Sequence, residues 1–216
     1  MTQGVPEITY LTHARTFYEQ PIGDAINLGK SGTAWIGPDE LGMRGDAFTD
    51  LSAVPRLRET IAGTYGQPVG EVGLARGTSC AIFTVLRALR DPQRAQAIVV
   101  ETPAYEPLFR VPEGLGYEVR FATPTHRPST PEAGSTRRLD LRAWDAAITG
   151  RTEAGDAGDE GEPVPARIGL LSSPHNPSGT ILKKADLQRL EKRLAGTDIL
   201  LLSDEVYEHL VFDGAE

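Results

Sequence analysis

Apolar side chains recur every four positions in the segment Pro55–Tyr65, where Leu57, Ile61 and Tyr65 fall at i, i+4 and i+8. An α-helix turns once in about 3.6 residues, so this spacing places the three side chains on one face of a helix. The sequence therefore predicts an amphipathic helix here, with a single apolar face.

Two further segments, Ser79–Leu89 and Lys184–Ala195, show the same periodicity. Their apolar positions are Ile82, Val85, Leu86 and Leu89 in the first segment and Leu187, Leu190 and Leu194 in the second. Asp91 and Pro92 follow the first segment and Gly196 follows the second, and these residue types commonly end helices. We predict a helix in each segment.

Four short runs of apolar and β-branched residues, each bounded by Gly, Pro, Ser or Asp, are typical of buried strands. They are Ala97–Thr102, Tyr117–Ala122, Arg167–Ser172 and Asp198–Ser203. Glu71–Ala75 is a fifth, shorter candidate strand. Because the third and fourth runs flank a predicted helix, we expect them to form a parallel β-α-β unit with a right-handed crossover.

Two stretches lack the periodicity of helices and strands. Residues 1–45 are rich in Gly and Pro, and we expect an arm that packs against another part of the protein. Residues 151–166 are acidic and have Val164 as their one large apolar residue, which favours a disordered surface insertion. We therefore divide the chain into an arm at 1–45 and a larger domain at 46–216 that contains the insertion.

The charge and composition argue against several classes of partner. The 216 residues carry a formal net charge of −8, from 22 Lys and Arg against 30 Asp and Glu. The chain therefore lacks the basic field that attracts nucleic acid or anionic lipid. No apolar run approaches the length of a membrane span and residues 1–13 show no targeting pattern, so we expect neither a membrane partner nor export. The single cysteine, Cys80, excludes an intramolecular disulfide and a Cys-x-x-Cys metal site and fits a cytoplasmic location.

The residues Gly77, Thr78 and Ser79 follow the candidate fifth strand and open a predicted helix. A helix N-terminus offers free N–H groups and the positive end of a dipole, which suits a phosphate. Gly77 lets the backbone approach such a ligand closely, and the two hydroxyl groups add donors. The alternative is that these small residues only cap the helix.

The end of the third strand leads into the turn Ser172–Gly179, and the carboxyl edge of a parallel sheet is where ligands bind. Asn176 lies in this turn between two prolines, which suits either an aimed hydrogen bond or an ordinary tight turn. His175 has no Cys, Asp or second His at metal-ligand spacing. We interpret it as a turn residue and expect no metal site.

Asp204 and Glu205 follow the fourth strand. Paired acids favour either an acid–base or metal site, or one acid that is buried against a specific partner while its neighbour faces solvent. Tyr105 lies just beyond the end of the strand Ala97–Thr102. Taken alone, it is more typical of packing than of a stacking platform.

In order along the chain, the motifs GTSCA, ETPAY, SPHNPSG and DEVY, preceded by FTDLSAVPRLRETIA, resemble those of class I/II aminotransferases. These are fold-type-I enzymes that depend on pyridoxal 5′-phosphate (PLP). The resemblance covers residues 26–212, and SPHNPSG together with DEVY is its most specific part. It implies an α/β fold, in which a mostly parallel sheet with helices on both faces forms an incomplete large PLP-binding domain behind an N-terminal arm.

The resemblance implies a cofactor site, and its residues are Gly77, Thr78, Ser79, Tyr105, Asn176, Asp204 and Tyr207. Thr78 and Ser79 match the positions that bind the PLP phosphate, and Gly77 provides clearance. Tyr105 matches the aromatic residue that stacks on the pyridine ring.

Three of these residues match positions that contact polar atoms of the ring. Asn176 and Tyr207 correspond to the pair that hydrogen-bonds the 3′-oxygen, where they stabilise negative charge. Asp204 corresponds to the carboxylate paired with the pyridine nitrogen, which keeps that nitrogen protonated so that the ring can accept electrons.

Several positions depart from the family pattern. Phe48 stands where the family commonly has a tyrosine that reaches the partner subunit's cofactor phosphate, and Ala53 replaces a usual glycine. Ser173 replaces the first asparagine of Asn-Pro-x-Asn-Pro. Asn27–Gly32 loosely resembles the arm that closes over the substrate carboxylate, without residues that can be assigned. These departures leave the subfamily and the substrate open.

In the family, the Schiff-base lysine, a further basic phosphate ligand and the arginine that binds the substrate carboxylate all follow the segment that corresponds to Phe212. The lysines of this chain are Lys30, Lys183, Lys184 and Lys192, and none has a Ser-x-x-Lys setting after DEVY. We therefore expect no catalytic residue in this chain, and we expect the isolated chain to be an inactive fragment of an enzyme.

The leading hypothesis is a PLP-dependent aminotransferase that transfers an amino group between an amino acid and a 2-oxo acid and is a homodimer when full length. The same residues also suit a PLP-dependent lyase, cyclase or synthase, and a non-catalytic truncated relative is a further alternative. The motifs do not separate these activities, because the substrate and the remaining half of the fold decide which bond breaks.

Overall fold

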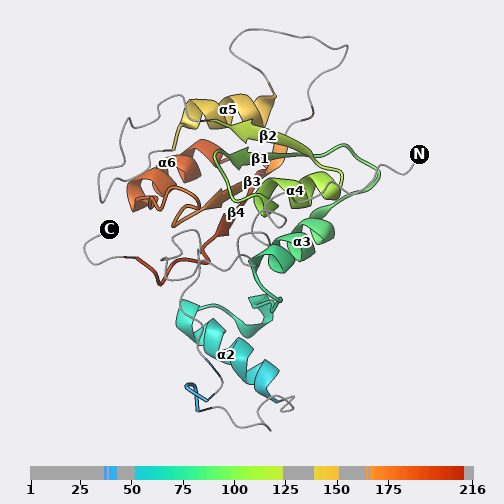
Figure 1. Cartoon of the computed structure of the whole chain (residues 1–216). Coiled ribbons are helices and arrows are strands. Elements are labelled where there is room, and N and C mark those ends of the chain that lie inside the picture. The colour runs from blue at the N-terminus through green and yellow to red at the C-terminus, as the bar shows by residue number, and fades with distance from the viewer. Residues whose placement is uncertain are drawn as a thin grey trace, which may run out of the picture. The chain divides into compact units, whose positions relative to one another are not determined.

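The structure is a computed structural model that describes residues 37, 39–42, 52–123, 139–150, 164 and 166–211 (Figure 1). The chain divides into two compact units, whose boundary lies between Ala75 and Arg76. The predicted boundary between residues 45 and 46 lies outside the described residues, as do residues 151–163 of the predicted insertion.

The first unit contains helix α2, Ala53–Tyr65, which confirms the predicted helix and begins two residues earlier. The helix ends where Gly66 adopts a left-handed backbone with φ of 63°. The predicted apolar face is less buried than expected, because Leu57 and Tyr65 remain about half exposed. The buried residue of the helix is Ala62. The periodicity of apolar residues thus predicted the helix correctly, but it did not predict which side of the helix is buried.

The predicted strand Glu71–Ala75 is wrong. The chain instead forms the short 3-10 helix η2, Val69–Glu71, and then continues without regular structure. The guanidinium of Arg58 in α2 donates to the carbonyl oxygens of Val69 and Val72, each at 2.9 Å, and Val72 lies within the predicted strand. Carbonyl groups that accept from a side chain in this way are not available to a strand ladder.

The second unit is built on a parallel sheet of four strands in the order β2-β1-β3-β4 (Figure 1). The strands are β1 Ala97–Glu101, β2 Glu118–Ala122, β3 Ala166–Ser172 and β4 Leu200–Asp204. All four predicted strands are confirmed, with ends that move by one or two residues. Ala166, which the sequence assigned to the insertion, is instead the buried first residue of β3.

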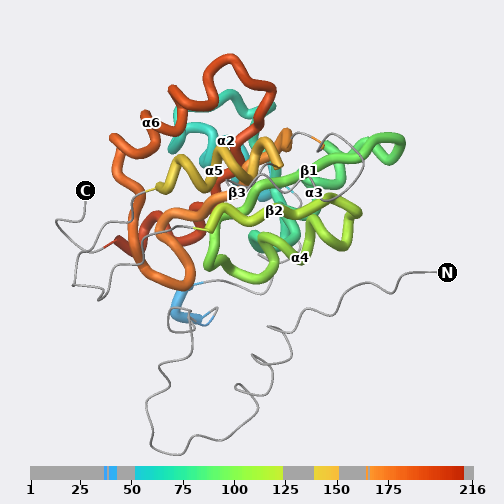
Figure 2. The backbone as a smooth tube through the Cα atoms, turned by 90° about the horizontal axis from the view of Figure 1, so that it is seen from above, coloured from blue at the N-terminus to red at the C-terminus, as the bar shows by residue number. Residues whose placement is uncertain are grey.

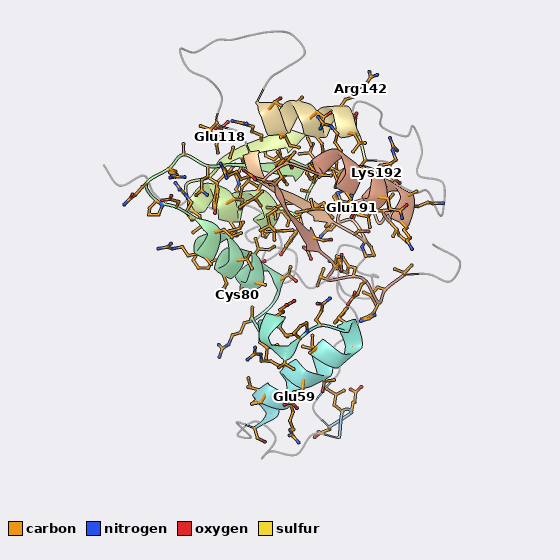
Figure 3. All side chains as sticks on the ribbon, turned by 180° about the vertical axis from the view of Figure 1, so that it is seen from behind. Glu59, Cys80, Glu118, Arg142, Glu191 and Lys192 are labelled. Carbon is orange, nitrogen blue, oxygen red and sulfur yellow. The ribbon has the colours of Figure 1, made fainter. Side chains whose placement is uncertain are left out.

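Helices cover both faces of this sheet and give the second unit three layers (Figures 1 and 2). Helix α5, Leu141–Thr149, and helix α6, Lys184–Leu194, lie on one face. There, the buried side chains of Trp144 and Leu190 pack in a cluster with Val99 of β1. Arg142 of α5 and Lys192 of α6, labelled in Figure 3, are exposed and point away from the sheet.

The opposite face is covered by α3, Thr78–Leu89, and α4, Pro107–Gly114. The cluster on this side contains Ile82 and Leu86 of α3, Leu108 of α4, and Ile98 and Val100 of β1. The predicted helices α3 and α6 are confirmed, and so is the parallel pairing of the strands that flank α6. The structure thus confirms the α/β fold with a parallel sheet between two layers of helices.

Helices α4 and α5 were not predicted. Helix α4 begins with Pro107, a residue type that suits the first position of a helix, but it also contains Pro112 in its second half, where proline normally interrupts a helix. Helix α5 is only 9 residues long, and the carboxylate of Asp140 caps it by accepting from the N–H groups of Arg142 and Ala143. In the described part of the chain, no helix is long and apolar enough to cross a bilayer.

Gly169 in the middle of β3 allows α5 to lie close to the sheet. A Cβ atom at this position would meet Cζ3 of Trp144 at 2.7 Å and Cδ1 of Leu201 at 3.2 Å. Only a residue without a side chain leaves room for the indole ring here, and the ring fills this position so well that Trp144 is 1% exposed.

Candidate functional site

The carboxyl ends of β1, β3 and β4 lie at one edge of the sheet, because these strands are adjacent and parallel. Ser172 at the end of β3 lies opposite Asp204 at the end of β4. The N–H group of Ser173 donates to the carbonyl oxygen of Asp204 at 3.0 Å, so the turn after β3 is attached directly to the end of β4. The structure therefore brings the SPHNPSG and DEVY motifs together.

Asp204 is the last residue of β4, and its carboxyl group is half-buried. It accepts a hydrogen bond from the backbone N–H of Val206 at 3.2 Å. Burial raises the pKa of Asp204 above its ordinary value, the N–H of Val206 opposes this shift, and the negative charge of Glu205 adds to it. Within the described residues, no basic side chain forms an ion pair with Asp204.

Glu205 is exposed, in contrast to its neighbour. The two acids of the DEVY motif therefore have different surroundings, as the sequence allowed, and Asp204 is the one that is partly buried. Tyr207 follows in the turn after β4 and is partly buried. Its carbonyl oxygen accepts from the N–H of Leu210 at 2.9 Å, which closes the turn.

The turn after β3 holds Asn176 as a partly buried residue. The hydroxyl oxygen of Ser173 accepts from the N–H of Leu182 at 3.1 Å, so this departure from the family's asparagine anchors the returning chain. The N–H of His175 donates to the carbonyl oxygen of Thr180 at 2.8 Å, and the N–H of Gly179 donates back to the carbonyl oxygen of His175 at 2.7 Å. The turn carrying Asn176 is therefore closed by backbone bonds on both sides.

His175 has a larger part in the site than the sequence indicated. It is a turn residue, as predicted, but its ring is buried and only 4% of the residue is exposed. Its Nε2 lies 2.7 Å from the carbonyl oxygen of Pro103, and its Nδ1 lies 2.6 Å from Oγ of Ser178. No local pattern reveals a contact with Pro103, which is 72 positions away in the sequence.

Tyr105 lies in the loop that joins β1 to α4. Its side chain is partly buried and packs against the cluster of α3, α4 and β1 described above. The N–H of Thr102 donates to the carbonyl oxygen of Ala122 at 3.1 Å, which fixes the start of this loop at the end of β2. Tyr105 thus has a packing role and is only partly buried.

Gly77 is the N-cap of α3, with a φ of 78°, and nothing lies within 4 Å of the position that its Cβ would take. Helix α3 begins at Thr78, so Thr78 and Ser79 are its first two residues and are not N-caps. Both are partly buried, whereas the next residue, Cys80, is exposed (Figure 3). The glycine N-cap has no side chain to accept from the first N–H groups, which stay available to another acceptor.

The comparisons with known proteins identify the family. The family model of class I and II aminotransferases matches residues 40–216. Methionine aminotransferase of Escherichia coli is 26% identical over 206 residues, which are 87% of this chain and 46% of that protein. The arginine–pyruvate transaminase AruH of Pseudomonas aeruginosa is 29% identical over 175 residues, or 77% of this chain and 38% of that protein. The chain thus spans less than half the length of these curated relatives.

Solved structures show the same fold. The structure of YbdL from Escherichia coli, for which a methionine aminotransferase function is described, has a TM-score of 0.55 at 26% identity and covers 72% of this chain and 36% of that one. An aminotransferase from Mycobacterium tuberculosis has a TM-score of 0.65 at 23% identity and covers 98% of this chain and 53% of that one. The parallel sheet with its two helical layers is therefore part of the fold-type-I architecture, and the chain belongs to the class I and II aminotransferase family, whose cofactor is PLP.

Proposed function

We propose that the whole protein is a PLP-dependent aminotransferase that transfers an amino group between an amino acid and a 2-oxo acid. In this proposal, the present chain supplies residues that bind the cofactor. The observation that carries the proposal is the carboxyl group of Asp204, which lies at the ligand-binding edge of the sheet, half-buried and with a raised pKa.

A buried carboxyl group needs a partner, and a protonated ring nitrogen is a suitable one. A cation at this point would lower the pKa of Asp204 again, and the carboxylate would in turn hold the proton on the nitrogen. The exposed Glu205 does not meet this requirement, because water already solvates its charge. The preference of the site for a protonated pyridine is thus attributed to Asp204.

The start of α3 suits the phosphate group of the cofactor. Gly77 leaves open space, and the N–H groups of Thr78 and Ser79 stand at the positive end of a 12-residue helix. The hydroxyl groups of the same two residues are further donors. A phosphate at this position supplies the acceptor that the glycine N-cap lacks.

The remaining residues would orient the ring. Tyr105 offers an aromatic side chain that is only partly buried, and Asn176 and Tyr207 offer donors to the 3′-oxygen. When bound, PLP supplies an electron-poor ring that stabilises the negative charge formed at the substrate Cα. The residues of this chain hold that ring in place and maintain its charge, while the choice of substrate depends on the rest of the protein.

Binding of pyridoxine 5′-phosphate to the 216-residue chain tests the proposal. This compound carries an alcohol in place of the aldehyde of PLP, so it cannot react with surface lysines. We expect it to bind and to raise the midpoint of thermal unfolding. Pyridoxine without the phosphate should bind more weakly, because it leaves the N-terminus of α3 without an anion.

Asp204→Ala and Glu205→Ala form a matched pair for the same titration. The first substitution should weaken binding by about tenfold or more, which is the usual loss for a hydrogen bond to a charged group. The second should leave affinity within experimental error. Equal losses for the two variants, or no binding of pyridoxine 5′-phosphate to the unsubstituted chain, would contradict the proposal.

A further inference from the structure

His175 joins two loops that come from neighbouring strands. It lies in the turn after β3, directly before Asn176, and its Nε2 is 2.7 Å from the carbonyl oxygen of Pro103 in the loop after β1. Tyr105 is two positions beyond Pro103 in the same loop. The buried ring of His175 therefore connects the loop that carries Tyr105 to the turn that carries Asn176.

The position of one ring proton follows from the chemistry of these contacts. A carbonyl oxygen only accepts, so Nε2 of His175 must carry a hydrogen atom and donate it to Pro103 whether the ring is neutral or charged. At the other nitrogen the partner is a hydroxyl group, which can donate or accept. The bond between the two loops is thus the one that fixes the orientation of the ring.

The hydroxyl groups on the other side support this orientation. Oγ of Ser178 lies 2.6 Å from Nδ1 of His175 and 2.7 Å from Oγ1 of Thr180. When Nδ1 is unprotonated, Ser178 donates to the ring and Thr180 donates to Ser178, so all three groups are hydrogen-bonded. Both ring nitrogens are therefore held, and a ring held at two points inside the protein has little freedom to rotate.

We propose that His175 is a positioning residue that sets the distance between Tyr105 and Asn176 by donating from Nε2 to the carbonyl oxygen of Pro103. This inference rests on the proposed function. The distance between Tyr105 and Asn176 matters only when the pyridine ring of the cofactor lies against Tyr105 and its 3′-oxygen lies near Asn176. His175 does not touch the cofactor in this proposal. It acts by holding the two loops that do.

Variants of His175 separate positioning from simple structural support. Glutamine can place an amide N–H near the position of Nε2, whereas asparagine is too short to reach Pro103. We expect His175→Asn to weaken the binding of pyridoxine 5′-phosphate roughly fivefold to tenfold, the usual effect of one buried hydrogen bond, and to reduce the circular dichroism that the bound pyridine acquires from its surroundings. His175→Gln should restore much of both signals. The matched control is His209→Asn, because the side chain of His209 is 81% exposed.

A second measurement needs no variant. Nitrogen NMR of the isotope-labelled histidine ring in the unsubstituted chain should show a hydrogen on Nε2 that exchanges slowly with water. A bare Nε2 would overturn the inference, even if His175→Asn failed to fold. Binding by His175→Asn that equals that of the unsubstituted chain would also overturn it while leaving the proposed function intact. If the unsubstituted chain does not bind pyridoxine 5′-phosphate, both proposals fail.

Discussion

At the scale of single residues, the fold treats two adjacent acids differently. Asp204 ends a strand and is partly withdrawn from water, whereas Glu205 is exposed. A carboxyl group that is partly buried and forms no ion pair lowers the stability of the folded state when it is charged. Such a cost is expected at a binding site, where the ligand rather than the protein completes the interaction.

Asp204→Asn should make the ligand-free chain more stable at neutral pH. The folded state raises the pKa of Asp204, so this carboxyl group contributes stability below its ordinary pKa of 3.8, and the contribution is lost as the pH rises through the raised value. Asparagine removes the charge that causes the loss. The expected gain is below about 1 kcal/mol, because the exposed part of the group keeps some solvation.

Denaturant unfolding between about pH 3 and about pH 8 measures this effect. The difference in unfolding free energy between Asp204→Asn and the unsubstituted chain should be smallest in acid and should grow as the pH increases. Glu205→Gln is the control, and its effect should stay within about 0.5 kcal/mol at every pH. A less stable Asp204→Asn at neutral pH would mean that the protein already stabilises the charge.

At the scale of secondary-structure elements, the layer of α5 and α6 depends on close approach to the sheet. Gly169 of β3 leaves the space that the ring of Trp144 occupies. Arg193 of α6 and Asp145 of α5 form an ion pair at 2.7 Å, which joins the two helices. The packing of Trp144 against the sheet and the ion pair with α6 therefore both hold α5 in its position.

Gly169→Ala should destabilise the chain by about 1 to 3 kcal/mol, the usual cost of an added methyl group in a packed core. The new Cβ would be 2.7 Å from the ring of Trp144, which is too close for two carbon atoms. Denaturant unfolding measures the loss. Gly63→Ala is the opposite control, because Gly63 lies in α2 with nothing within 4 Å, so alanine should raise stability by up to about 1 kcal/mol.

A double substitution checks the cause of this loss. A smaller ring in Trp144→Phe should recover part of the stability that Gly169→Ala loses, so the two effects should not add. Strictly additive effects would show that the new methyl group does not meet the indole ring.

Elements with a regular pattern could be predicted from the sequence, and irregular ones could not. Helices α3 and α6 follow from the periodicity of their apolar positions, and the four strands follow from short apolar, β-branched runs that are typical of strands buried between two layers. Helix α4 was not predicted because it is only 8 residues long and contains Pro112, an internal proline that normally breaks a helix. The strand predicted at Glu71–Ala75 was wrong: the 3-10 helix η2 ends at Glu71, and the carbonyl group of Val72 accepts from Arg58 of α2.

The candidate site, too, could be predicted from the sequence only in part. The placement of Asp204 at a strand end follows from the sequence, as does the polar turn around Asn176. The role of His175 does not, because its main contact is with Pro103 in a loop that only the folded sheet brings near. Local residue types predict where a polar group stands along an element, whereas the groups that face it depend on the topology.

At the scale of the whole molecule, none of the lysines that the structure describes follows the sheet edge that we propose to bind the cofactor. Of the described lysines, Lys183 and Lys184 are exposed at the start of α6, and Lys192 is exposed in its last turn. None follows β4, the strand that carries Asp204. The residues that we propose to bind the cofactor and the described lysines thus belong to different parts of the unit.

The 216-residue chain should therefore show no transaminase turnover. Incubation with PLP, reduction with borohydride and peptide mass mapping should give only scattered, partial labelling of lysines. An excess of pyridoxine 5′-phosphate should not protect any lysine, because exposed amines react without the site. One lysine that is labelled completely, protected by pyridoxine 5′-phosphate and accompanied by turnover would contradict this prediction.

The strand order β2-β1-β3-β4 has a consequence for how the chain folds. Strands β1 and β2 are close in sequence, but the pairing of Ala97 with Ala166 at the centre of the sheet joins positions about 70 residues apart. On the ribosome, β1 and β2 emerge on the order of seconds before β3. During that interval, the most apolar strand of the sheet has one edge open, so the nascent chain is most prone to aggregate in the middle of its synthesis.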